Sequence, residues 1–86
     1  MNTIFLLMAE FDSPSIPLEK VAPKYFGINS LDKAKRMAAR NELPIAFFKA
    51  TSSNKCPWHC HVQDLANLID TKREAANDEF KKSNLL

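Results

Sequence analysis

The chain has 86 residues, which is enough for one small domain with a modest hydrophobic core. A composition of 45% hydrophobic and 26% charged residues, with a single glycine, is ordinary for a globular domain and excludes a linker or low-complexity chain. The longest apolar run, residues 4–9, is too short to span a membrane, and no signal-peptide pattern surrounds it. We therefore expect a cytoplasmic protein whose two cysteines are free thiols.

Residues 3–11 form the first expected element. They are apolar and partly aromatic, which favours a short buried strand; a helix is the alternative, because a continuous apolar run shows no periodicity. Turn-forming residues follow at 12–15. Pro17 suits the first position of a helix, whose apolar stripe runs to Phe26 and which Pro23 shortens or kinks. Gly27, the only glycine, predicts that this helix ends there in a left-handed backbone conformation.

A second helix is predicted over residues 30–40, with Asn29 or Ser30 as its cap. Its inner face is apolar and consists of Leu31, Ala34, Met37 and Ala38. Residues 45–50 are then predicted as a strand, and residues 51–55 as a polar hairpin tip. Residues 58–62 are a strand by alternation, with Trp58, Cys60 and Val62 on the buried face.

A last helix is expected to start near Gln63. Residues 77–86 are its end or a flexible tail, with Phe80, Leu85 and Leu86 available to a partner. The predicted order is strand, helix, helix, strand, strand, helix. This order indicates an α+β fold: a small winged helix-turn-helix of about three helices, a β-hairpin wing and a short N-terminal strand, with the DNA-binding domain over residues 1–76.

Positive charge is concentrated in the middle of the chain. Residues 20–55 carry eight basic and only two acidic residues, although the net charge of the whole chain is +2. Such focusing is typical of proteins that bind polyanions, most simply duplex DNA. A basic helix fits the major groove and a polar hairpin tip reaches phosphates or the minor groove; a solvated helix and an ordinary turn are the alternatives. The candidate DNA-binding residues are Ser30, Lys33, Lys35, Arg36, Met37, Arg40, Lys49, Ser52, Ser53, Asn54, Lys55 and His59.

Residues 56–61 (CPWHCH) crowd four potential metal ligands into six positions. Structural zinc sites use two separated ligand pairs, and alternation along a strand points His59 and His61 away from Cys60. We therefore expect no metal and no cofactor, with Cys60 buried as a small hydrophobe and the histidines exposed on the wing. The carboxylates are scattered, and no glycine-rich phosphate loop is present, so no enzymatic activity is expected.

Several segments resemble a known family. Residues 3–9 (TIFLLMA), 16–19 (IPLE) and 25–26 (YF) are similar to the opening of the pyocin activator protein (PrtN) family, and residues 43–44 (LP), 53–55 (SNK) and 62–66 (VQDLA) to its second half. The resemblance spans about residues 3–76; its second half is also similar to excisionase and MerR-like winged helices. It implies a DNA-binding regulator with a recognition helix at residues 30–40 and a wing at 49–59.

The leading interpretation is a sequence-specific, double-stranded-DNA-binding activator of prophage or bacteriocin-type genes. It would be nucleoid-associated, with cooperative self-association on DNA and contacts to RNA polymerase. One alternative is an excisionase, or recombination directionality factor, that acts beside an integrase and bends DNA. Another is a phage-encoded protein–protein adaptor that uses the C-terminal helix.

Overall fold

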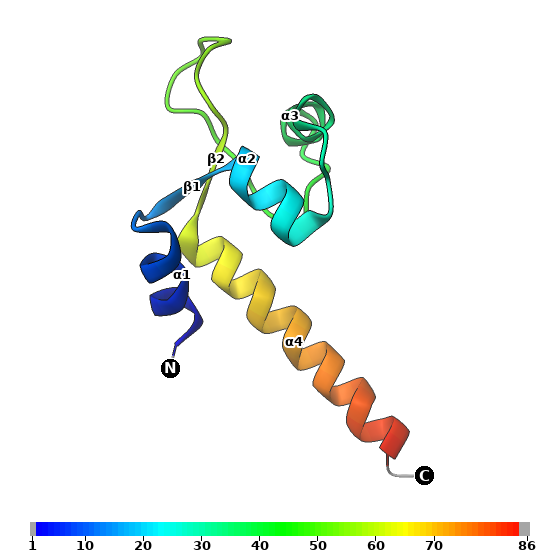
Figure 1. Ribbon diagram of the computed structural model, residues 1–86. Coiled ribbons are helices and arrows are strands. Elements are labelled where there is room, and N and C mark those ends of the chain that lie inside the picture. The colour runs from blue at the N-terminus through cyan, green and yellow to red at the C-terminus, as the bar shows by residue number, and fades with distance from the viewer. Residues whose placement is uncertain (1, 85–86) are drawn as a thin grey trace.

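The computed structural model describes residues 2–84 and has a small α+β, winged helix-turn-helix-like fold, as the sequence predicts (Figure 1). The elements in chain order are α1 (Thr3–Phe11), β1 (Ser15–Pro17), α2 (Leu18–Val21), the π-helical turn η1 (Ala22–Phe26), α3 (Leu31–Ala39), β2 (His59–His61) and α4 (Val62–Asn84).

The N-terminal segment is a helix, so the favoured prediction of a strand over residues 3–11 was wrong and the alternative, a helix, is confirmed. Within the apolar run, Ile4, Leu7 and Phe11 recur at helical spacing and turn inward, with Leu7 buried. The Asn2 side chain caps the helix by accepting a hydrogen bond from the Ile4 N–H at 2.9 Å. Asp12, in the left-handed conformation, ends it. Because most of the other residues in this segment are also apolar, the sequence alone shows no helical periodicity.

The sheet has two short antiparallel strands that are far apart in sequence. β1 pairs with β2 in the register Ser15↔His61, Ile16↔Cys60 and Pro17↔His59. The strand predicted over residues 45–50 is absent; Phe48 forms only an isolated bridge with His59. Continuing that ladder toward the tip would pair Ala50 with Pro57, whose nitrogen cannot donate a hydrogen bond. The wing is therefore an extended loop anchored at its base by one bridge.

The helix-turn-helix follows from local chemistry. α2 runs into η1, which has Pro23 in its first turn and ends at Gly27 with φ of 68°. This left-handed conformation favours glycine and confirms the predicted stop. Ser30 caps α3 by accepting a hydrogen bond from the Lys33 N–H at 3.3 Å. Asn41, with φ of 56°, turns the chain out of α3.

The core lies where β1, β2, α2 and the start of α4 meet. Its largest fully buried side chains are Ile16, Leu18, Val21, Cys60, Val62 and Leu65. Ala34 and Ala38 bring α3 against this cluster, and α1 packs along α4, where Thr3 Oγ1 donates a 2.5 Å hydrogen bond to Asp70. The buried face predicted for residues 58–62 is confirmed at Cys60 and Val62, whereas Trp58 is only half-buried.

The far half of α4 leaves the body of the molecule (Figure 1). The radius of gyration is 15.0 Å, against roughly 12 Å for a compact domain of this length. Residues 77–84 continue α4 as helix, and the partner contacts expected of Leu85 and Leu86 lie outside the described residues. In the part of the chain that the structure describes, no helix combines the length and apolarity needed to cross a membrane.

We predict that Leu65→Ala lowers the free energy of unfolding by about 2–5 kcal/mol, because this fully buried side chain would leave a cavity in the core. Urea denaturation followed by circular dichroism measures the change. The matched control is Asn67→Ala on the exposed side of the same helix, which should stay within about 0.5 kcal/mol of the parent. Equal midpoints for the two variants would contradict the burial of Leu65.

Candidate nucleic-acid interface

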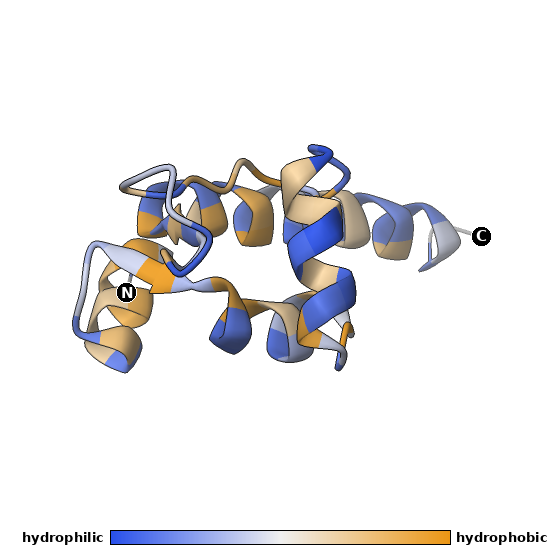
Figure 2. Cartoon of the chain, turned by 90° about the horizontal axis from the view of Figure 1, so that it is seen from above, coloured by the Kyte–Doolittle hydropathy of each residue, from blue (hydrophilic) through white to orange (hydrophobic). Residues whose placement is uncertain are grey.

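The face of α3 that points away from the core is basic. Ala34 and Ala38 are the buried side of the helix, at 0% and 4% exposure. At 100° per residue, Arg36 lies opposite them and is exposed. Along α3 in Figure 2, hydrophilic segments alternate with more hydrophobic ones. The small alanines hold α3 close to the core, so the long basic side chains are its most protruding groups.

The two flanks of this face differ. Lys33 and Arg40 lie on one flank, and Lys35 lies on the other, toward the wing. Arg40 reaches Glu42 at 4.0 Å, but its side chain remains 70% exposed. An exposed pair at that distance contributes little, since such ion pairs are worth about 0–1 kcal/mol. Arg40 is therefore free to exchange Glu42 for another anion.

The wing tip is a set of hydroxyl-stabilised turns. Thr51 Oγ1 accepts a hydrogen bond from the Ser53 N–H, and Ser53 Oγ accepts one from the Lys55 N–H at 3.2 Å. Asn54 and Lys55 are exposed at this tip. Each of these two hydroxyl oxygens accepts one hydrogen bond, and among residues 2–84 the Lys55 ammonium group forms no ion pair.

The wing also holds a cation over an aromatic ring. Lys49 Nζ lies 5.2 Å from the centroid of the Trp58 ring. Trp58 is half-buried, and its backbone carbonyl accepts a hydrogen bond from the Leu18 N–H at 2.9 Å. This cation–π contact orders the long Lys49 side chain on the surface of the wing.

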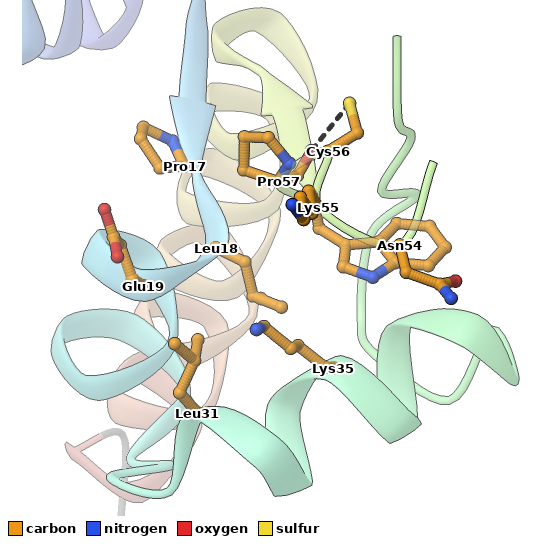
Figure 3. A pocket seen from close by; sticks show the side chains of 10 residues that line it. Pro17, Leu18, Glu19, Leu31, Lys35, Asn54, Lys55, Cys56 and Pro57 are labelled. Carbon is orange, nitrogen blue, oxygen red and sulfur yellow. Dashed lines mark hydrogen bonds between the residues drawn. The ribbon is translucent and has the colours of Figure 1, made fainter. Parts of the chain in front are cut away.

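A cleft of about 120 Å³ separates α3 from the wing tip. Lys35 lines it from α3, and Asn54 and Lys55 line it from the wing (Figure 3). Leu18 and Leu31 form part of its wall, and Glu19 is its acidic member. Two lysines from elements about twenty residues apart thus converge on one small opening, which suits a phosphate oxygen better than a cation.

The structure brings most of the predicted site residues to this side of the molecule, on α3 and the wing. Met37 instead turns toward α4, where it lines a groove with Leu68 and Ile69. His59 lies at the base of the wing, where its backbone exchanges two hydrogen bonds with Phe48, at 2.8 and 2.9 Å. Ser30 serves α3 as its N-cap.

Sequence reasoning assigned Leu31 and Trp58 to the core, yet both line the cleft. Leu31 is 38% exposed because it begins α3, one turn before the helix meets the core. Trp58 carries an indole N–H beside a large apolar ring, so an exposed edge suits it. That dual character is the only signal in the sequence for its position.

The cysteines and histidines of residues 56–61 do not form a metal-binding cluster within the described part of the chain. Within residues 2–84, no three histidine, cysteine or acidic side chains gather around a common point. Cys60 is fully buried, and burial raises the pKa of its thiol to about 11. His61 Nδ1 accepts a hydrogen bond from the Gln63 N–H at 3.0 Å and so gives this backbone donor in the first turn of α4 a partner. Backbone hydrogen bonding at Thr51 lowers the pKa of Cys56.

Comparison with known proteins identifies the family. A family model described as pyocin activator protein PrtN matches residues 3–76. The chain belongs to the pyocin activator protein PrtN family. No curated protein and no solved structure matched it. The matched region contains α1, the helix-turn-helix, the wing and the first part of α4, so the whole candidate interface lies inside it.

Membership of the PrtN family gives the chain a class of function. The family is one of transcriptional activators of pyocin genes. The predicted resemblance is therefore confirmed at the level of the family.

Cys60 should make stability depend on alkaline pH. The unfolded chain loses the thiol proton near its ordinary pKa of 9.0, whereas the folded chain keeps it up to about 11. The contribution of the neutral thiol is complete below the lower value and is lost as the pH rises toward the higher one. We predict that the stability advantage of the parent over Cys60→Ala narrows as the pH is raised from about 8 to about 10.5, measured by urea denaturation. A constant advantage over that range would contradict the buried thiol.

Proposed function

We propose that this chain is a sequence-specific, double-stranded-DNA-binding transcriptional activator that acts in the cytoplasm on phage-like or bacteriocin-type genes. The observation that carries the proposal is the exposed basic face of α3 beside the wing, with Lys35 of α3 and Lys55 of the wing lining one cleft between them. α3 enters the major groove, and the wing lies on the phosphate backbone or in the minor groove.

The dimensions of α3 support the major groove. A helix with its side chains is about 10–12 Å across, and the major groove of B-DNA is about 12 Å wide. Arg36 is at the centre of the exposed face, with Lys33 and Arg40 on one side of it. An arginine in this position donates two hydrogen bonds to the O6 and N7 atoms of guanine. Arg36 is thus our base-reading residue, and its neighbours bind phosphates.

The wing supplies a contact that does not depend on sequence. Lys35 and Lys55 border the same cleft, so a backbone phosphate near its mouth would attract both. The wing therefore fixes the register of α3 on the duplex, and α3 reads the bases.

Substitution of Arg36 tests the base-reading role. In fluorescence-anisotropy titrations with DNA from the protein's own locus, Arg36→Ala should weaken binding by about 1–3 kcal/mol and reduce the preference over an unrelated fragment. The matched control is Lys81→Ala, which removes an exposed positive charge on α4, away from the candidate interface. Unchanged preference in Arg36→Ala would refute the assignment of α3 as the reading helix.

Substitution of Lys55 tests the wing contact by a different readout. Lys55→Ala should weaken binding to the locus DNA and to the unrelated fragment by similar factors. It should also reduce the slope of log K against log salt concentration by about one unit, because one phosphate contact is lost. If the slope stays that of the parent, the wing tip does not contact the backbone.

A further inference from the structure

The far half of α4 has the composition of a helix that needs a partner. Every residue from 71 to 84 is exposed. A single helix of this length is marginally stable in water, because tertiary packing supplies most helical stability in proteins. This segment also exposes one large apolar side chain, Phe80, at 68%. Burial of that ring would stabilise both the helix and whatever covers it.

An apolar stripe runs along α4 from Ile69 to Phe80. Ile69, Ala76 and Phe80 are spaced seven and four residues apart, which places them on one helical face. Ala76 occupies its middle, with Ala75 beside it, and these small side chains leave room for close approach of another helix. The stripe thus begins at the apolar Ile69, has small side chains at its centre and ends at the bulky ring of Phe80.

The beginning of the stripe opens into an apolar groove of about 670 Å³. Its walls come mainly from η1, α3 and α4, and its apolar lining includes Tyr25, Phe26, Ile28, Met37, Leu68 and Ile69. Lys72 and Glu42 lie at its polar edge. The groove and Phe80 belong to the same stripe, one at each end.

We propose that α4 of a second copy of this chain occupies the groove, in an antiparallel two-fold pair centred between Ala75 and Ala76. That centre is about four residues from Phe80 and about four from Lys72, so symmetry places each Phe80 ring beside Ile69 and Lys72 of the other copy. Each copy therefore contributes one projecting ring and one apolar groove, which is the self-complementarity that a two-fold interface requires.

Charge supports this register. Lys72 and Glu79 lie on the same flank of the stripe, seven residues apart and at equal distances from the proposed centre. In an antiparallel pair, like flanks face each other, so Lys72 of each copy meets Glu79 of the other. Among residues 2–84, neither side chain forms an ion pair within its own chain. The arrangement makes two such pairs and no like-charge contact between them.

Sedimentation of the full-length protein without DNA tests this pairing, independently of the proposed DNA binding. From about 1 μM to about 500 μM, the range expected for a small interface, the parent should pass from monomer to dimer. Phe80→Ala should raise the dimer dissociation constant at least about tenfold, as loss of a buried aromatic anchor does. Phe5→Ala is the matched control, because Phe5 is 64% exposed on α1 and should leave the dimer unchanged.

Charge reversal tests the register. K72E and E79K should each dimerise more weakly than the parent, whereas an equimolar mixture of the two should form a heterodimer, because both facing pairs are then opposite in charge. Circular dichroism checks that each variant is folded. A parent that stays monomeric overturns the proposal, as does a dimer that Phe5→Ala abolishes and Phe80→Ala leaves intact. A mixture no better than the single variants excludes this register.

Discussion

The short ladder between β1 and β2 is the constraint on which the rest of the molecule depends. It extends at both ends through the Leu18 N–H bonded to the Trp58 carbonyl and the Val62 N–H bonded to the Pro14 carbonyl, at 2.9 and 2.8 Å. β1 leads directly into α2, and β2 leads directly into α4. Six paired residues therefore set where the helix-turn-helix, the wing and the long helix lie relative to one another. Burial of Ile16 and Cys60 at the middle of the ladder excludes water from it.

The same junction explains the geometry of the candidate interface. Trp58 immediately precedes β2 and is bonded to the first residue of α2, so the base of the wing is tied to the helix-turn-helix. Pro57 stops the ladder at this point, and the tip beyond it is held by hydroxyl turns and by Lys49 over Trp58. The base of the wing is thus rigid and its tip is shaped mainly by local contacts. Such a tip can adjust to a phosphate while the base keeps its distance from α3.

The parts of the fold that the sequence predicts best are those with one dominant local cause. Gly27 readily adopts the left-handed conformation that ends a helix, and the Ser30 hydroxyl can cap the start of one. Both residues occupy the predicted positions. α3 combined a clear apolar period with a basic exterior, so its buried alanines and exposed Arg36 could be predicted as well.

The errors have one physical origin, which is tertiary context. Residues 3–11 are apolar in every direction, and only packing on α4 shows which side chains face inward. Residues 45–50 have strand-like composition, but their partner segment offers Pro57 where a donor is needed. Trp58 and Leu31 are apolar residues that line an opening, and no periodicity separates such positions from the core. The cleft itself joins residues from separate elements and is visible only in three dimensions.

The size of α3 connects the two proposals. At 1.5 Å per residue, its nine residues span about 13 Å, which allows contact with only a few base pairs. One such helix gives little discrimination against the very large number of competing sites in a genome. A two-fold pair through α4 would present two α3 helices related by the symmetry of an inverted repeat, and the specificities of the two half-sites would combine. An activator built on so short a reading helix therefore needs a second copy for selectivity, and the projecting, otherwise unsupported half of α4 is the part of this chain suited to hold it.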